Sequence, residues 1–425
     1  MIDSTHSERK ARAEDASRLS SPRSDRSQGN GEFRDGPWSV FLVFLRLGMT
    51  SFGGPIAHLG YFRSEFVERR RWLTDRDYSD LVALCQFLPG PSSSQVGMAL
   101  GLGRAGWPGL LAAWAGFTLP SALALILFAY GVGQYQDLAR SGWVHGLKIV
   151  AVAVVAQAVW GMAKSLCPDR PRATLAVLAA LLTLILPSAS GQVAAIVCAG
   201  VVGRWMLEPP QPPGGRAHAY PISRKAGVVA LCLFALPLAG LPMWAAFSGS
   251  SMAALLDGIY RSGALVFGGG HVVLPLLQSA VVPSGVVSSA DFLAGYGAAQ
   301  AVPGPLFTFA AYLGTIADST LNGWRGGLAW LALIFLPGFL VLAAALPFWE
   351  SLRRRPGIQA AMAGINAGVV GILLSALYDP VWTGAIHGKA DFGLALAAFG
   401  LLVFGRLPPA LVVLLAGVAG WAMAG

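Results

Sequence analysis

Two Pro-Gly-Pro sequences are the first residues of this chain whose types and spacing could do chemistry. They are Pro89-Gly90-Pro91, within QFLPGPSSSQ, and Pro303-Gly304-Pro305, within QAVPGPLFT. Proline disrupts a helix interior but is favoured at the first position of a new helix. Each PGP is therefore predicted to end one half-helix and to start another. The free N–H groups and partial positive charge at such a helix start favour a bound anion.

Polar side chains flank both PGP sequences, and we predict that they contact the same anion. The alternative is that each PGP is a proline kink used only for packing. Hydroxyl groups follow directly only after the first PGP, so the first half is expected to supply most of the anion contacts. The flanking residues are Gln86, Ser92, Ser93, Ser94 and Gln95 in the first half, and Gln300 and Thr308 in the second.

Two glycine-rich sequences suggest a second pair of backbone breaks. The first, FGGP, contains Gly53, Gly54 and Pro55; the second, FGGG, contains Gly268 and Gly269. Glycine lets the backbone approach a ligand closely and frees N–H groups to point at it. Close packing between membrane helices explains the same residues equally well.

A histidine follows each glycine-rich sequence, His58 in the first half and His271 in the second. Histidine titrates near neutral pH and could carry protons during transport. The alternative for a lone histidine is a structural side chain held by hydrogen bonds.

Arg46 and Arg261 each precede the phenylalanine of the glycine-rich sequence at the same distance, inside apolar stretches. An arginine at mid-membrane costs about 2.5–3.5 kcal/mol on insertion scales, so it usually faces a partner or a wet cavity. Its planar fork of donors suits an oxyanion. The alternatives are snorkelling to the membrane interface and, for Arg261, pairing with a nearby carboxylate such as Asp257.

The elements that position these residues occur twice along the chain. RLGMTSFGGP (46–55) matches RSGALVFGGG (261–270), and the two PGP segments follow at similar distances. GWPG (106–109) then matches GWRG (323–326), and Leu119-Pro120 matches Leu336-Pro337. Four matched landmarks in one order indicate a duplicated domain. We predict halves at 37–203 and 226–425, joined by a polar linker at 204–225.

Composition places both halves in a membrane. The chain has 425 residues, of which 55% are hydrophobic and 12% charged, against about 25% charged in soluble domains. Apolar runs long enough to cross a bilayer must be helical, because no water satisfies the backbone there. We predict an all-α integral membrane protein of roughly ten to twelve helices with broken or re-entrant segments. The runs are Trp107–Tyr130, Trp143–Ala163, Ala226–Phe247, Phe292–Ile316 and Trp324–Phe348.

The net charge of +9 lies mainly in short loops, which indicates topology and not nucleic-acid binding. The segment 63–76 is basic, whereas its counterpart 279–290 has no Lys or Arg. In the second half, Arg353–Arg355 make a loop basic whose first-half counterpart, near Tyr135–Asp137, has no Lys or Arg. Equivalent loops are therefore predicted on opposite sides, as in inverted repeats. Residues 1–36 are polar, near neutral and without a signal-peptide pattern, and we predict a disordered cytoplasmic tail.

No enzyme or metal site is predicted. The four cysteines have no metal-ligand spacing, so neither a metal nor another cofactor is expected. Ser92–Ser94 with His58 could be imagined as a nucleophile and its base, but no GxSxG sequence surrounds them and a hydrolase does not explain the duplication.

These motifs resemble the chromate ion transporter family. FGGPIAHLGYFRSEFVERRRWL (52–73) and YSDLVALCQFLPGPSSSQVG (78–97) look like the N-terminal half of its two-domain members. FGGGHVVLPLL (267–277) and FLAGYGAAQAVPGPLFTFAAYLG (292–314) look like the C-terminal half. The resemblance covers nearly everything from residue 37 onward. It implies a multi-pass protein of the bacterial inner membrane that exports chromate, a tetrahedral dianion resembling sulfate. Proton-gradient coupling is also implied.

The expected mechanism places the anion between the half-helix starts after PGP and the FGG amides, with Arg46 offsetting its charge. A negative-inside potential favours export of anions by about 2.3 kcal/mol per charge per 100 mV. Potential-driven export and proton antiport both stay open. A sulfate or other oxyanion transporter and an anion channel are the alternatives. Expected partners are chromate, sulfate as a competing anion and the lipid bilayer; a homodimer is left open.

Overall fold

The computed structural model describes residues 36–134, 142–208, 220–267, 270–352 and 355–424. Every regular element in these ranges is a helix, with no strand, which confirms the predicted all-α class. The predicted tail lies outside the described residues except for Gly36. So do residues 209–219 of the predicted linker and the predicted site residues Gly268 and Gly269.

The first half begins with short helices that stop at the predicted breaks. Helix α2 (Pro37–Thr50) ends before the first FGG, and α3 (Gly54–Arg63) starts within it and continues into the π-helical turn η1 (Ser64–Arg69). Helix α4 (Asp75–Phe87) is capped by the Thr74 hydroxyl and ends before the first PGP. Backbone breaks at both motifs are thereby confirmed.

Helix α5 (Ser92–Gln134) follows the first PGP and contains a sharp bend. Ala105 and Gly106 have non-helical backbone angles, and the positive φ of Gly106 suits a residue without a Cβ. The chain folds back there, so that the backbones of Gly101 and Gly109 meet closely. An inner arm (92–104) and a long outer arm (107–134) result.

The second half repeats this order, and its PGP divides an apolar run. The prediction of one helix across Phe292–Ile316 is wrong, because α13 ends at Ala301 and the next α-helix starts at Phe309. A PGP sequence removes backbone donors and cannot continue the helix. The elements are α11 (Ser251–Ala264), η2 (Gly270–Val272), α12 (Val273–Val281), α13 (Ser289–Ala301), η3 (Leu306–Thr308), α14 (Phe309–Ile316) and α15 (Gly323–Ala345).

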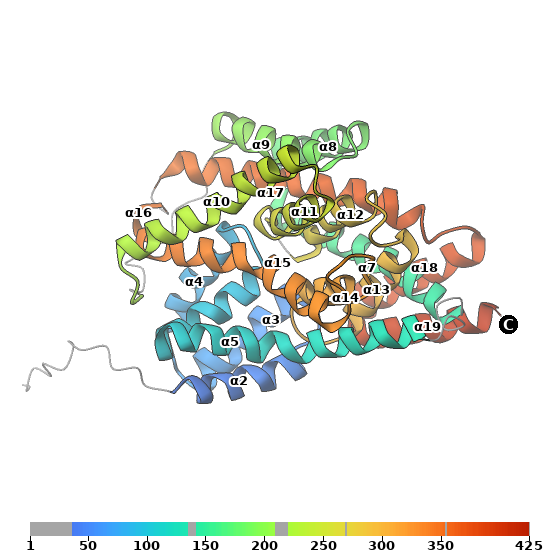
Figure 1. Ribbon diagram of the computed structural model, residues 1–425, viewed down its shortest axis with the longest axis horizontal. Helices are drawn as coiled ribbons and strands as arrows, with labels where there is room; N and C mark the ends of the chain where they lie inside the picture. The colour runs from blue at the N-terminus through green and yellow to red at the C-terminus, as the bar shows by residue number, and fades with distance from the viewer. Residues whose placement is uncertain (1–35, 135–141, 209–219, 268–269, 353–354, 425) are drawn as a thin grey trace, which may run out of the picture. The chain divides into compact units, whose positions relative to one another are not determined.

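Each half ends in three further helices, and these interlock between the halves. Helix α7 packs against α18 and α19, and α17 packs correspondingly against α8 and α9 (Figure 1). Glycines allow the close approach: a Cβ on Gly203 would lie 2.6 Å from Cα of Gly364. The helices are α7 (Gly142–Leu166), α8 (Arg170–Ile185), α9 (Ala189–Met206), α17 (Pro356–Ala376), α18 (Lys389–Val403) and α19 (Pro409–Ala424).

The outer arm of α5 and its repeat equivalent, α15, lie side by side and run in opposite directions. Near the start of the arm, the ring of Trp107 lies 6.0 Å from that of Phe339, towards the end of α15. Near the end of the arm, the Tyr130 hydroxyl accepts a hydrogen bond of 2.9 Å from the backbone N–H of Trp324, near the start of α15. The matched GWPG and GWRG sequences therefore lie at opposite ends of this helix pair.

Within the described residues, six helices are long and apolar enough to cross a bilayer. One of them, α10 (Arg224–Ser248), buries little of its surface against the protein, as expected of a helix in contact with lipid. The chain is therefore a multi-pass membrane protein. The remaining short elements are η4 (Leu346–Phe348), α16 (Trp349–Leu352) and η5 (Leu377–Trp382).

Candidate functional site

The PGP of each half is hydrogen-bonded to the other half. The N–H of Gly304 donates to the carbonyl of Ser51 at 2.9 Å, and the N–H of Gly90 donates to the carbonyl of Val266 at 2.7 Å. Ser51 and Val266 each directly precede the phenylalanine of an FGG sequence. The two backbone breaks thus meet in crossed pairs, each pair made by an FGG from one half and a PGP from the other.

Close packing at the two PGP glycines accompanies these bonds. Gly90 and Gly304 have positive φ values of 118° and 98°. A Cβ on Gly90 would lie 3.0 Å from Cα of Gly338, and one on Gly304 would lie 2.8 Å from Oγ of Ser121. Gly338 and Ser121 each follow the proline of a matched Leu-Pro sequence. Both PGP turns therefore need glycine for their conformation and for the approach to a neighbouring helix.

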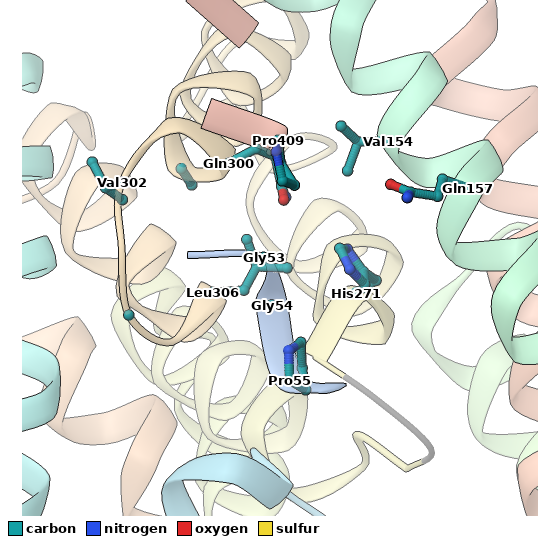
Figure 2. Close-up of a pocket in the computed structure, with 12 residues that line it drawn as sticks. Gly53, Gly54, Pro55, Val154, Gln157, His271, Gln300, Val302, Leu306 and Pro409 are labelled. Atoms are coloured by element: carbon teal, nitrogen blue, oxygen red, sulfur yellow. The ribbon is translucent and has the colours of Figure 1, made fainter. Parts of the chain in front are cut away.

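A cavity lies where the first FGG meets the second PGP (Figure 2). Its volume is about 40 Å³, against roughly 10–15 Å³ for one water molecule, so it holds a few waters or one small ion. No described residue lining it carries a formal charge, counting histidine as neutral. The lining residues are Gly53, Gly54, Pro55, Val154, Gln157, His271, Ala299, Gln300, Val302, Gly304, Leu306 and Pro409.

The start of α3 gives the cavity its positive end. Gly53 is the N-cap, with φ 101°, and Pro55 occupies the first turn of the helix. Gly53 has no side chain to cap this turn and Pro55 has no N–H, which leaves the N–H groups of Gly54 and Ile56 without an intrahelical acceptor. These free donors and the helix dipole favour an anion in the cavity. Sequence analysis predicted such a helix start after PGP, whereas the one at this cavity follows FGG.

His271 and Tyr296 form a pair at the cavity wall. Nδ1 of His271 lies 2.9 Å from the hydroxyl of Tyr296, whose side chain is fully buried. The other ring nitrogen is turned toward the start of α3, since a Cβ on Gly54 would lie 3.9 Å from Nε2 of His271. Tyr296 was missed in the sequence, where it looks like one more aromatic residue of an apolar run.

Two glutamines bring amide groups to the cavity (Figure 2). Nε2 of Gln300 is buried and has no hydrogen-bond partner among the described residues. Gln157 lies on α7, with Nε2 3.5 Å from the carbonyl of Leu402. Gln157 was not predicted, although one amide within the apolar run Trp143–Ala163 is a recognisable signal, since polar groups inside membranes are costly.

His58 does not line the cavity; it joins elements within the first half. It is fully buried, with Nε2 3.2 Å from the carbonyl of Ser51 and Nδ1 3.3 Å from Oγ of Ser93. Ser51 also accepts the hydrogen bond from Gly304. His58 therefore connects the helix after the first PGP to the crossed junction of the second.

Of the other polar residues near PGP, Gln95 bonds both within its own half and across to α15, and Thr308 bonds locally. Nε2 of Gln95 donates to the carbonyls of Pro89 and Gly338, at 2.8 and 3.1 Å. The Thr308 hydroxyl donates to the carbonyl of Pro305 at 2.8 Å. The predicted residues in and beside the two PGP sequences that lie outside the cavity lining are Gln86, Pro89, Gly90, Pro91, Ser92, Ser93, Ser94, Gln95, Pro303, Pro305 and Thr308.

Neither predicted arginine lines the cavity. Arg261 forms an ion pair with Asp257 one helical turn away, at 2.9 Å. Arg46 is on the exposed side of α2 and lines a separate surface groove. The cavity thus gathers six predicted residues: Gly53, Gly54, Pro55, His271, Gln300 and Gly304. In the described part of the chain, no cluster of His, Cys, Asp or Glu side chains could hold a metal ion.

The sequence matches known proteins along both halves. The model of the chromate transporter family matches residues 38–204 and 253–421. A chromate transport protein of Pseudomonas aeruginosa is 28% identical over 404 residues, covering 90% of this chain and 91% of the relative. A chromate transport protein of Cupriavidus metallidurans is 26% identical over 351 residues, covering 80% and 81%. No solved structure matches the chain significantly. With both of its halves matched, this chain belongs to the chromate transporter family.

Proposed function

We propose that this protein exports chromate across the bacterial inner membrane as a secondary active transporter. The observation that carries the proposal is the cavity enclosed by the FGG of one half and the PGP of the other. An anion bound there touches both halves, so movement of one half against the other would open the cavity to one side or the other. Its relatives in Pseudomonas and Cupriavidus, both chromate transport proteins by name, support the choice of cargo.

Alternating exposure of this kind follows from inverted repeats, which we propose for the two halves, with ten to twelve membrane-crossing or re-entrant helices. The antiparallel course of α5 and α15 supports opposite orientation. The crossed FGG–PGP hydrogen bonds relate the halves by approximate two-fold symmetry. Inverted halves can exchange conformations around one central site.

Neutral donors bind the anion in this proposal. The free N–H groups at the start of α3 point at it, and the amide of Gln300 donates to it. We propose that Tyr296 donates its hydroxyl hydrogen to Nδ1 of His271, 2.9 Å away, which would place the proton of the neutral imidazole on Nε2, the nitrogen turned toward the start of α3. No lysine or arginine among the described lining residues holds the anion, which suits release after each crossing.

Replacing Gln300 with leucine is expected to raise the KM for chromate about tenfold or more. A hydrogen bond to a charged group contributes roughly 1.5–3 kcal/mol, and each 1.4 kcal/mol is a factor of ten. The matched control is Gln86→Leu, because Gln86 is the repeat equivalent and is exposed away from the cavity. Initial uptake rates at several chromate concentrations give the KM of each variant. Equal KM values for Gln300→Leu and Gln86→Leu would show that Gln300 does not contact the anion.

Tyr296→Phe is expected to raise KM roughly fivefold, because the ring of His271 loses the bond that sets its tautomer. The control is Tyr312→Phe, whose buried hydroxyl donates to the carbonyl of Asp291 at 3.2 Å. In a His271→Gln background, the Tyr296 change should have little further effect, since glutamine needs no tautomer. Full additivity of the two changes would show that Tyr296 acts by packing alone.

The test of the function is chromate uptake into everted membrane vesicles. Saturable uptake above that of empty vesicles, accelerated by chromate or sulfate preloaded on the opposite side, is the expected result. Sulfate should compete for uptake, and a protonophore reports whether an energised membrane is required. Uptake without saturation or trans-stimulation would indicate an anion channel. Folded, inserted protein without uptake would refute the chromate assignment.

A further inference from the structure

The exposed face of α2 carries an arginine within an apolar stripe. Trp38, Leu42 and Met49 are 68%, 47% and 52% exposed, and Arg46 lies between them at helical spacing. Residues three and four apart share a helix face. In a membrane protein such an exposed apolar face contacts lipid, so Arg46 points from a lipid-contacting surface.

The guanidinium of Arg46 makes no hydrogen bond or ion pair with any residue that the structure describes. A charge on a lipid-facing surface is costly unless its side chain reaches polar headgroups. Helical side chains lean toward the N-terminus, here toward Leu42 and Trp38. Tryptophan is enriched at membrane–water interfaces, so Arg46 extends toward the headgroup region and needs an anion there.

A groove of about 400 Å³ lies at this position. Two arginines, one glutamate and one serine line it together with three apolar side chains. Its residues are Trp38, Ser39, Leu42, Val43, Arg46, Glu65 and Arg70.

The charges around the groove do not balance. Glu65 accepts hydrogen bonds from Arg70 at 2.6 Å and from Arg69 at 2.8 Å. Burial alone would raise the pKa of Glu65, but these two guanidinium groups hold it below its ordinary value. One carboxylate thus faces three guanidinium groups when Arg46 is included. An anion with two or more oxygen acceptors would complete the set, and guanidinium binds phosphate well.

We propose that this groove binds an anionic phospholipid, with its phosphate between Arg46 and Arg70 and an acyl chain along Trp38 and Leu42. The apolar wall distinguishes a lipid from a free anion, because only a lipid buries it. The site is separate from the central cavity, and it is independent of what the protein transports.

The test uses the full-length protein reconstituted in phosphatidylcholine, with or without one part in five of phosphatidylglycerol. Native mass spectrometry after detergent extraction counts the retained lipids. The wild type is expected to retain one phosphatidylglycerol, and Arg46→Gln to bind it at least about fivefold more weakly, since a basic residue near the surface contributes roughly 1 kcal/mol. Arg224→Gln is the matched control, because it removes an exposed charge at the start of α10.

Arg46→Gln removes a charge from an apolar stripe and should therefore insert and fold; thermal unfolding in phosphatidylcholine alone checks this. Equal retention of phosphatidylglycerol by the wild type and Arg46→Gln overturns the proposal. So does equal weakening by Arg224→Gln, which would indicate general surface charge. Inorganic phosphate that displaces phosphatidylglycerol at comparable concentration would mark the groove as a site for free anions and would also overturn it.

Discussion

Gly304→Ala is expected to abolish saturable chromate transport. Gly304 has φ 98°, a conformation that costs an alanine roughly 1–2 kcal/mol. The new methyl group would lie 2.8 Å from Oγ of Ser121 and 3.2 Å from the carbonyl oxygen of Phe117. The PGP turn must then move away from α5, which lengthens its hydrogen bond to Ser51 and displaces Gln300 from the cavity. Uptake into everted vesicles measures the loss.

Gly285→Ala separates backbone strain from this contact. Gly285 also has a positive φ, 74°, but a Cβ there meets no atom within 4 Å. It should lose some thermal stability and keep its transport rate. If Gly304→Ala transports as well as Gly285→Ala, the crossed junction does not need its close approach, and the proposed coupling between the halves fails.

Gly146→Leu is expected to prevent assembly of the folded protein. Gly146 lies on α7 where the helix meets α19, and a Cβ there would collide with the backbone carbonyl of Ala416. Overpacking in a tight core typically costs 1–3 kcal/mol. The new leucine would collide with backbone atoms, which cannot move aside as a flexible side chain can. We therefore expect a loss of stability of about 3 kcal/mol or more. The measurement is the fraction of extracted protein that remains monodisperse, with its unfolding temperature.

The control for this second prediction lies on the same helix. A Cβ on Gly161 meets nothing within 4 Å, so Gly161→Leu changes helix propensity and apolar area equally without the collision. Gly161→Leu should stay monodisperse. Comparable yields and unfolding temperatures for the two variants would show that α7 and α19 are not held together by this contact.

The backbone breaks and the duplication were predictable because they follow from local chemistry. Each PGP sequence combines two prolines, which remove backbone donors, with a glycine, which weakens a helix, whereas single prolines such as Pro120 and Pro337 lie inside helices. The matched landmarks reveal the repeat without any structure. The apolar run Phe292–Ile316 carried two conflicting predictions, one helix by its length and a break by its PGP, and the break is confirmed.

The residues that line the cavity were only partly predictable, because the lining depends on which elements of one half contact which elements of the other. The sequence shows one FGG and one PGP in each half, and gives no sign that each pairs with the other half's partner. The sequence therefore favoured Ser92–Ser94 as anion ligands, although they do not line the cavity, and it did not indicate Gln157, which reaches the cavity from α7.

Arg46 shows a different limit of sequence reasoning. The cost of an arginine in a membrane indicates that Arg46 needs a partner, but both faces of α2 are apolar. The sequence therefore does not show which face of α2 packs against the protein and which faces the lipid. The structure places Arg46 on the exposed face, beside Glu65 and Arg70.

Because the end helices of the two halves pack against each other, α7 must wait during synthesis for its partners from the second half. Helix α7 is complete at Leu166, but α19, which meets Gly142 and Gly146 of α7, begins only at Pro409. At the usual 5–20 residues per second, the ribosome needs roughly 10–50 s to supply it. During that interval the face of α7 that carries Gly142 and Gly146 lacks its final neighbour. Insertion factors or lipid must cover this face until the last two helices emerge, so a chain truncated before α18 should be recognised as unassembled and degraded.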